Sequence, residues 1–557
     1  MSENWLEKLS KPQYKIKEEK DVFIAMRDGV RLAADIYRPD TGGKFPALLA
    51  ISAYGKDVQK LKGPIGPLNP HRGNGGQESG DTEYFVSRGY VHVIVDVRGS
   101  GDSGGEFPFF GTKEQEDGYD LVEWIAKQPW CDGNVGMVGM SVFGLVQFLV
   151  AAQNPPHLKA IFPYDAYTDR YRHQMYHGGI LNMGFYAQWW GHVSVGASVP
   201  RSLRENPKEI KKVVEDLNQT DEIQSHPFLY ITLKYPEKNV PMFEGLVHPF
   251  DGPFYWETSA YTKFNQIKIP CYMVGRWSAW PIHLAGAFAA YNGINAPKKL
   301  MVMETENPSG PIRPWRDHHD IILRWYDHWL KGIDTGMMSE PPIRLLIKGK
   351  NEWRYENEWP LARTQWTKFY LRGNGGLTRQ PAGRDEPPDT FVNKGFPLPR
   401  EVLPGIKYRT PPLEEDLEVT GPVALYFHAT LDRPEATWFA TINDLAPDGT
   451  TRLITKGWLR ASHRAIDEKR SKPYQPFHPH TESIPVEPGK VYEYAIDIRE
   501  TSNVFEAGHW IELVIKGQDS SSEDPIWFHL CNLKETKHTI YHSPEYLSYL
   551  LLPVIPK

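Results

Sequence analysis

The spacing of apolar residues changes along the chain, and each change predicts a different architecture. Between about residues 20 and 160, short continuous apolar runs alternate with amphipathic segments. Runs such as 46–52 and 91–97 are typical of strands that are covered on both faces, and 114–127 carries its apolar residues on one helical face. This alternation predicts an α/β fold with a mainly parallel sheet.

The later segments depart from that rhythm and return to it once. Residues 161–258 are rich in Tyr, Trp, His and Met, which predicts a helical insertion that roofs a pocket. The α/β rhythm resumes over 259–360, so this segment is expected to complete the core that 1–160 begins. From 365 to 557, short strand-like segments alternate with Gly- and Pro-containing turns, which is typical of a β-sandwich or jelly roll.

Composition narrows the classes of partner. The 557-residue chain has a formal net charge of −6, which argues against a nucleic-acid-binding protein. Its three cysteines, Cys131, Cys271 and Cys531, lie far apart without metal-ligand spacing, so we expect no metal and no cofactor. There is no apolar run long enough to span a membrane and no apolar signal-peptide core, so no membrane partner is expected and the predicted location is cytoplasmic.

A short segment around Ser141 carries the strongest chemical signal. The apolar run 135–139 leads into Ser141, and the apolar segment 142–152 follows at once. This pattern predicts a strand, a sharp turn and a helix, with the serine hydroxyl exposed at the helix N-terminus. The usual G-x-S-x-G spacing is altered, because Gly144 lies one position later than expected. An ordinary turn with a small residue at the bend is the alternative.

Longer motifs give a family resemblance that covers nearly the whole chain. They are the segments 27–37, 96–107, 130–141, 324–332 and 457–463. With them, the chain resembles the CocE/NonD family of cocaine esterase, X-prolyl dipeptidyl aminopeptidases and α-amino-acid ester hydrolases. The resemblance implies an α/β-hydrolase core with an inserted helical cap and a C-terminal β jelly-roll domain.

The resemblance also implies a Ser-His-Asp triad, of which this chain keeps only part. Ser141 falls on the nucleophile, and Tyr54 falls on the tyrosine that helps to bind the oxyanion. The backbone N–H of Val142 would be the second oxyanion donor. Ser278 stands where the family has Asp, and Asn307 stands where it has His. Since an amide cannot act as a general base, we expect little hydrolysis of simple activated esters unless another residue substitutes.

Several residues are candidates for a relocated base. His283 lies near the start of a predicted helix, and His318 and His319 follow a short loop. For all three we favour a position on a helix surface or in an N-terminal turn. Glu304 and Glu306, just past a predicted strand, are better placed and could serve if burial raises the pKa of one of them.

Other residues are candidates for binding substrate. Arg276 is expected at the C-terminal end of a strand, where it could hold a substrate carboxylate or pair with Glu304 or Glu306; the intramolecular pair is the simpler interpretation. The remaining pocket candidates are aromatic side chains or histidines, for which packing within the core is an equal alternative: Trp277, Tyr176, His177, Tyr186, Trp189 and Trp190.

Three functions remain open at this point. The first is an acyl hydrolase of the ester, lactone or amide type with a relocated base. The second is a non-hydrolytic enzyme, such as a decarboxylase, C–C lyase or isomerase, that uses the oxyanion hole on an aromatic or acidic substrate. The third is a catalytically silent binding protein. All three take a small-molecule partner, and a homo-oligomer is compatible with this architecture.

Overall fold

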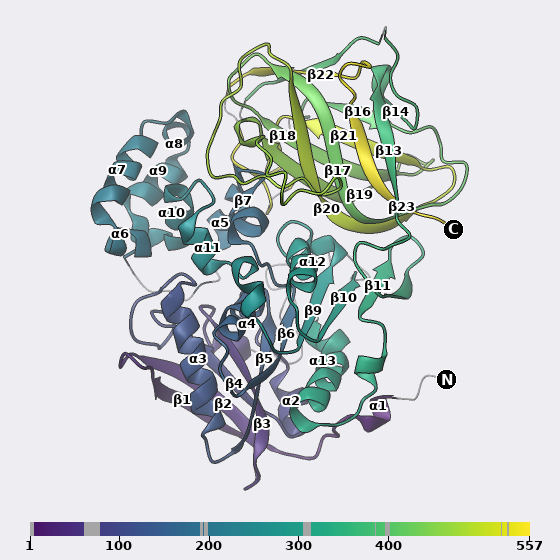
Figure 1. Cartoon of the computed structure of the whole chain (residues 1–557). Helices are drawn as coiled ribbons and strands as arrows, with labels where there is room; N and C mark the ends of the chain where they lie inside the picture. Colours follow the sequence, from purple (N-terminus) through teal and green to yellow (C-terminus); the bar gives the residue numbers. More distant parts are fainter. Residues whose placement is uncertain are drawn as a thin grey trace.

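The computed structural model places an α/β domain, a helical insertion and a β-barrel side by side (Figure 1). It describes the chain apart from residues 1–4, 61–77, 190–192, 194–198, 305–313, 385, 396–401, 525 and 532–533. No helix in this described portion is long and apolar enough to cross a membrane.

The α/β domain is built on a ten-stranded sheet of order β1-β2-β4-β3-β5-β6-β9-β10-β11-β12. The strands from β4 to β11 run parallel to their neighbours, whereas β1, β2 and β12 are antiparallel additions at the two edges. Their bounds are β1 Ile16–Ala25, β2 Arg31–Pro39, β3 Phe45–Ser52, β4 Val91–Asp96, β5 Cys131–Met140, β6 Leu158–Tyr164, β9 Cys271–Arg276, β10 Lys298–Met303, β11 Ile343–Ile347 and β12 Glu352–Glu356.

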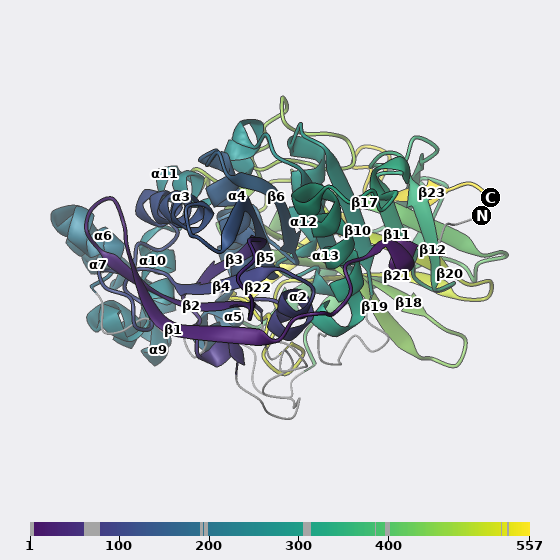
Figure 2. The ribbon, with the colours of Figure 1, turned by 90° about the horizontal axis from the view of Figure 1, so that it is seen from below.

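Helices cover both faces of this sheet, as Figure 2 shows from below. Helices α3 (Thr112–Ala126), α4 (Val142–Ala152) and α12 (Leu284–Gly293) contribute to one buried cluster, and α2 (Thr82–Ser87) and α13 (Pro314–Lys331) contribute to another. Side chains of each central strand therefore alternate between two apolar cores. The continuous apolar runs in the sequence reflect this double coverage.

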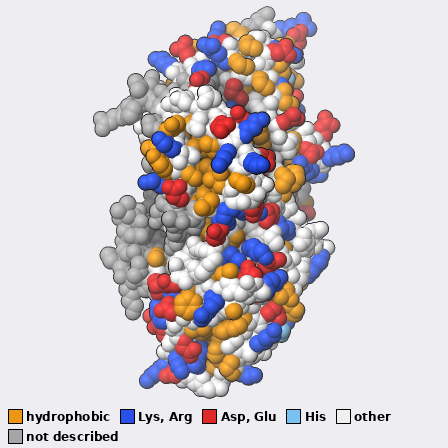
Figure 3. All heavy atoms as spheres, turned by 90° about the vertical axis from the view of Figure 1, so that its left-hand side faces the viewer, with side chains coloured by type: hydrophobic (Ala, Val, Ile, Leu, Met, Phe, Trp, Pro, Cys, Tyr) orange, Lys and Arg blue, Asp and Glu red, His pale blue; other side chains and the backbone are white. Residues whose placement is uncertain are grey.

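The insertion lies between β6 and β9 and is mainly helical. It begins with a π-helical turn, η2 (Arg170–Met175), and the two-residue strands β7 (Tyr176–His177) and β8 (Ile180–Leu181). Its helices are α5 Met183–Trp189, α6 Arg201–Glu205, α7 Pro207–Leu217, α8 Asp221–Ser225, α9 Pro227–Lys234, α10 Val240–Val247 and α11 Pro253–Thr258. Figure 3 looks at the molecule from the side of the insertion and shows charges of both signs interspersed with apolar side chains.

The C-terminal domain is a closed barrel consistent with a jelly roll. Nine strands form a ring in the order β17-β20-β19-β18-β21-β16-β14-β13-β23, and β23 pairs with β17 to close it. The ring strands are β13 Gln365–Arg372, β14 Gly376–Thr378, β16 Gly405–Arg409, β17 Leu417–Leu431, β18 Thr437–Leu445, β19 Thr451–Arg460, β20 Tyr492–Phe505, β21 Trp510–Lys516 and β23 Tyr549–Ile555. Strands β15 (Asp389–Asn393) and β22 (Thr536–Tyr541) extend from β17. The barrel encloses its own apolar core.

Candidate active site

Ser141 occupies the sharp turn between β5 and α4. Its backbone is in a conformation with φ 59° and ψ −112°, which is strained for a residue with a side chain. The Ser141 N–H donates to Tyr164 O at 3.0 Å, and Ser141 O accepts from the N–H groups of Gly144 and Leu145 at 3.0 and 2.9 Å. These bonds hold the turn, which is the strand–turn–helix arrangement that the sequence predicts.

The two glycines of this turn lie where a side chain would clash with its neighbours. A Cβ on Gly139, whose φ is 141°, would lie 2.3 Å from the Phe143 Cβ. A Cβ on Gly144 would lie 2.8 Å from the Ala166 Cβ and 3.1 Å from Tyr164 O. The glycine that stands one position late in the motif therefore lets α4 pack closely against the chain that leaves β6.

An imidazole lies against the serine hydroxyl. His283 Nε2 is 3.1 Å from Ser141 Oγ, within hydrogen-bond distance. Burial and the nearby Arg276 cation lower the pKa of His283 to about 3. His283 also precedes the first residue of α12, where the helix dipole disfavours a positive charge. The ring is consequently neutral at pH 7 and can accept a proton.

This finding corrects the expectation that Ser141 faces no proton acceptor. We favoured a helix-surface or N-terminal-turn position for His283. The residue does directly precede α12, after the short 3-10 turn η6 (Trp277–Ala279), but its ring lies against Ser141. His283 N–H donates to Ala279 O at 2.9 Å, which fixes the turn. The candidate proton acceptor therefore lies in the segment after β9, and not in the segment after β10 in which Asn307 stands.

The other candidates for the base are placed differently. His318 Nδ1 lies 3.3 Å from the Tyr164 hydroxyl, and the ring of His319 stacks on Tyr84 at 3.7 Å. Glu304 lies close enough to Arg276 to raise the pKa of its guanidinium. Glu306 and Asn307 fall outside the described residues.

Ser278 follows β9 at the family's acid position. Its hydroxyl is buried and has no hydrogen-bond partner among the described residues. No carboxylate in the described part of the chain forms a hydrogen bond or an ion pair with His283 Nδ1. The geometry within these residues is therefore a serine–histidine pair.

Arg276 pairs with Asp165, whereas we expected Glu304 or Glu306 as the partner. Its Nε donates to the Asp165 carboxylate, and both side chains are buried. Asp165 directly follows β6 with φ 44°, which turns its side chain toward the end of β9. The sequence did not suggest this contact because the two residues come from different strands. Its consequence for chemistry is a fixed cation close to His283.

Tyr54 and Val142 are the two candidates for oxyanion donors. Tyr54 follows β3, and its backbone N–H donates to Ser52 Oγ at 3.1 Å. Burial raises the pKa of the Tyr54 hydroxyl well above its usual value, so the group keeps its proton. Val142 is the first residue of α4, where a backbone N–H has no acceptor within the helix.

Two of the remaining pocket candidates lie near Tyr54. Trp189 Nε1 donates to the Tyr54 hydroxyl at 2.8 Å, and the Tyr186 ring packs edge-on against Trp189 at 5.8 Å. Trp190 lies outside the described residues.

Three further candidates make structural contacts instead. The Tyr176 hydroxyl donates to Gly245 O at 3.0 Å, His177 bonds to His529 of the barrel, and Trp277 Nε1 donates to Leu346 O at 2.7 Å. The alternative of core packing is the better description of these three side chains.

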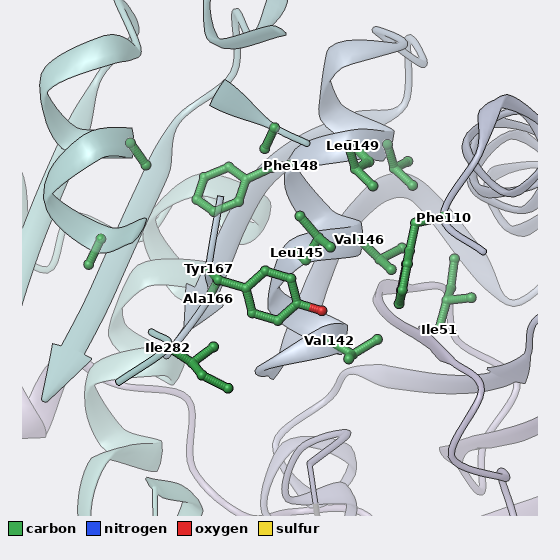
Figure 4. Close-up of a cluster of buried hydrophobic side chains, with 14 of the residues drawn as sticks. Ile51, Phe110, Val142, Leu145, Val146, Phe148, Leu149, Ala166, Tyr167 and Ile282 are labelled. Atoms are coloured by element: carbon green, nitrogen blue, oxygen red, sulfur yellow. The ribbon is translucent and has the colours of Figure 1, made fainter. Parts of the chain in front are cut away.

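Sequence reasoning missed two residues near the site. The Tyr167 ring lies 6.2 Å from that of His283, and Figure 4 shows its hydroxyl directed toward Val142, with Ile282 beside the ring. Glu78 lies near Tyr54 and Asp165, and burial with the Asp165 charge raises its pKa to about 8. Glu78 stands in a polar segment without a local pattern, so no sequence signal could have found it.

Comparison with known proteins identifies the family. The family model described as X-Pro dipeptidyl-peptidase (S15 family) matches residues 28–307. The chain belongs to this family. The X-Pro dipeptidyl-peptidase C-terminal non-catalytic domain matches residues 335–551, which include the barrel as far as the first residues of β23. The chain is therefore a hydrolase of the CocE/NonD kind, with the α/β-hydrolase fold that the resemblance implied.

Two individual relatives span the whole architecture, and a third matches about half of the chain. Cocaine esterase of Rhodococcus sp. (strain MB1 Bresler) is 28% identical over 611 residues, covering 96% of this chain and 98% of its own. A crystal structure of a CocE/NonD family hydrolase from Staphylococcus aureus matches with a TM-score of 0.79 at 26% identity, covering 97% and 94% of the two chains. An Xaa-Pro dipeptidyl-peptidase of Lactobacillus helveticus is 25% identical over 333 residues, covering 56% of this chain and 39% of its own.

Proposed function

We propose that this protein is a carboxylesterase that forms an acyl-enzyme on Ser141, with His283 as the general base. The single observation that carries the proposal is the 3.1 Å separation between Ser141 Oγ and His283 Nε2. A serine hydroxyl near pH 7 needs such a neighbour to take its proton. The Tyr54 hydroxyl and the Val142 N–H supply the donors that a tetrahedral oxyanion requires.

The reaction proceeds in two half-reactions. Ser141 Oγ attacks the ester carbonyl carbon while its proton passes to His283 Nε2, and the carbonyl oxygen becomes an oxyanion bound by the two donors. The C–O bond to the alcohol then breaks, and His283 returns the proton to the departing alkoxide. Water repeats the sequence on the acyl-enzyme, so one ester and one water give an acid and an alcohol.

The electrostatics around His283 favour esters over amides. The Arg276 cation and burial make the imidazole a weak base, so the protonated ring forms at a low population. An ester tolerates this better, because an alkoxide leaves more readily than an amine, which must be protonated before it departs. Relatives of both kinds span most of the chain: the cocaine esterase is 28% identical over 96% of it, and a putative Xaa-Pro dipeptidyl-peptidase of Bacillus anthracis is 23% identical over 92% of it.

The walls beside the serine suit an apolar or aromatic ester. Val142, Tyr167, Ile282 and Phe110 belong to one buried cluster and lie around the start of α4 (Figure 4). Apolar walls with a few oriented polar groups are typical of small-molecule sites.

This geometry removes the reason for proposing a non-hydrolytic enzyme. It rested on a serine without a proton acceptor, and His283 supplies one. The same contact argues against a catalytically silent binding protein, because a strained turn and a neutral imidazole meet at one serine hydroxyl.

Two assays test the proposal. A fluorophosphonate probe should label wild-type protein at Ser141, and a p-nitrophenyl ester of an aromatic acid should be turned over; Ser141→Ala should abolish both. Ser278→Ala is the matched serine control, and it should retain labelling and turnover. Absence of labelling and turnover in correctly folded wild-type protein would refute the esterase. Faster turnover of an X-Pro anilide than of the ester would show a peptidase instead.

A further inference from the structure

The oxyanion donor Tyr54 has a hydrogen-bond partner that belongs to the insertion. Trp189, the last residue of α5, donates its indole N–H to the Tyr54 hydroxyl oxygen at 2.8 Å. An indole nitrogen can only donate, so the tyrosine oxygen is the acceptor in this contact. The single tyrosine proton is consequently available for another acceptor.

The indole is fixed by packing on both sides. Its ring stacks on Phe110 of the α/β domain with centroids 6.4 Å apart, and on Phe185 of its own helix at 6.2 Å. Trp189 is 3% exposed. The N–H group is therefore held in one direction, and a side-chain donor that is held by packing loses little freedom when it forms a bond.

We propose that Trp189 is a positioning residue for the oxyanion hole: its N–H fixes the Tyr54 hydroxyl so that the tyrosine proton is directed to the oxyanion formed at Ser141. The donation also polarises the Tyr54 O–H group, because hydrogen bonds in a chain strengthen one another. The inference deepens the proposed esterase function and rests on it.

Because of this contact, the orientation of the Tyr54 hydroxyl depends on the position of the insertion relative to the sheet. Tyr54 comes from the loop after β3, whereas Trp189 comes from α5, 135 residues away. A shift of α5 relative to the sheet moves the indole and releases the tyrosine hydroxyl to rotate.

A double-mutant cycle on ester hydrolysis tests the proposal. Trp189→Phe keeps an aromatic ring and removes the N–H, so kcat should fall roughly 5- to 10-fold while KM changes less than about twofold. Tyr54→Phe should lower kcat by roughly 100-fold. In the Tyr54→Phe background, Trp189→Phe should have no further effect, since the hydroxyl on which the indole acts is absent.

The control variant separates this role from simple packing. Trp527 stacks on Phe185, which lies on the same helix as Trp189, with ring centroids 5.2 Å apart. Trp527→Phe alters this packing and should leave kcat within about twofold of wild type. Replacement of Trp189 by benzothienylalanine keeps the bicyclic shape without the N–H group and should reproduce the loss of kcat. This variant keeps the test valid if Trp189→Phe does not fold.

The outcomes distinguish the inference from the function on which it rests. Wild-type protein that neither hydrolyses esters nor reacts with a fluorophosphonate overturns the esterase. If the wild type is active and Trp189→Phe lowers kcat by the same factor in the wild-type and Tyr54→Phe backgrounds, the positioning role alone is overturned. An aryl boronate, which forms a tetrahedral adduct with serine, should bind the Trp189→Phe variant more weakly by the same factor as the loss in kcat; unchanged binding also overturns it.

Discussion

Imidazole rings serve two different purposes in two regions of this molecule. At the end of the α/β sheet, His283 faces a serine hydroxyl. Where the barrel meets the insertion, buried rings face each other: His177 Nδ1 lies 2.9 Å from His529 Nε2, and His463 Nδ1 lies 3.1 Å from His480 Nδ1. A low pKa alone therefore does not mark a catalytic histidine; the partner of the ring does.

The two regions differ in what protonation disrupts. In the proposed mechanism, His283 receives its proton from Ser141 during the reaction. A hydrogen bond between two imidazoles needs one ring to accept, so it is lost when both rings are protonated. Burial lowers the pKa of His177 and His480 well below the usual value, with help from neighbouring positive or protonatable groups.

The largest expected effect comes from removing the base. His283→Gln should lower kcat/KM for ester hydrolysis by roughly 10³- to 10⁶-fold, because the Ser141 proton has no acceptor. Fluorophosphonate labelling of Ser141 should be lost in parallel. The matched change in the other region, His177→Gln, should keep activity and lower the free energy of unfolding by about 1–3 kcal/mol. Equal activity losses in the two variants would remove the distinction between the regions.

Acid should unfold the protein through the barrel–insertion contact. The pKa of His463 is lowered to about 3 by burial and the Arg460 charge, so between pH 6.5 and 3 the unfolded chain binds the proton and the folded protein does not. Each such histidine reduces stability by about 1.4 kcal/mol per pH unit as the pH falls through this window. Urea unfolding at pH 7, 6 and 5 measures the slope. His463→Asn should make it shallower, and an unchanged slope would contradict this assignment.

A smaller effect should follow from removing the charges near the base. Arg276→Gln with Asp165→Asn removes the cation that lowers the pKa of His283, together with its buried partner. In wild type the base stays neutral as the pH falls through 6.5, so kcat/KM should show no inflection there within the range in which the protein is folded. The double variant should shift the acid limb toward pH 6.5. A pH profile of ester hydrolysis checks both expectations, and identical profiles would show that Arg276 does not influence the base.

The smallest effect is expected at Ser278. Its buried hydroxyl has no partner among the described residues, so Ser278→Ala removes an unsatisfied polar group. The free energy of unfolding should stay within about 1 kcal/mol of wild type or rise slightly, and kcat should not change. A large loss of activity would show that this hydroxyl orients His283.

Local sequence patterns predict much of the fold but less of the candidate site. The turn at Ser141 was predictable because strand, serine and helix are adjacent in sequence. The base was not, since His283 lies 142 residues from Ser141 and reaches it through the η6 turn, which leaves no periodic signal. Aromatic residues near the site were equally ambiguous: Trp189 reaches Tyr54, whereas Trp277 turns inward to Leu346.

The two sheets also end differently, and this bears on self-association. The barrel ring closes on itself and its sheet has one outer strand at β15, whereas the α/β sheet has outer strands at β1 and β12. Strand β1 carries Lys17, Glu18, Glu19 and Lys20 in succession. Alternating groups of charge on a free edge discourage the backbone pairing that seeds aggregates. Neutralising these four side chains would remove that protection and expose a template on which other chains can add.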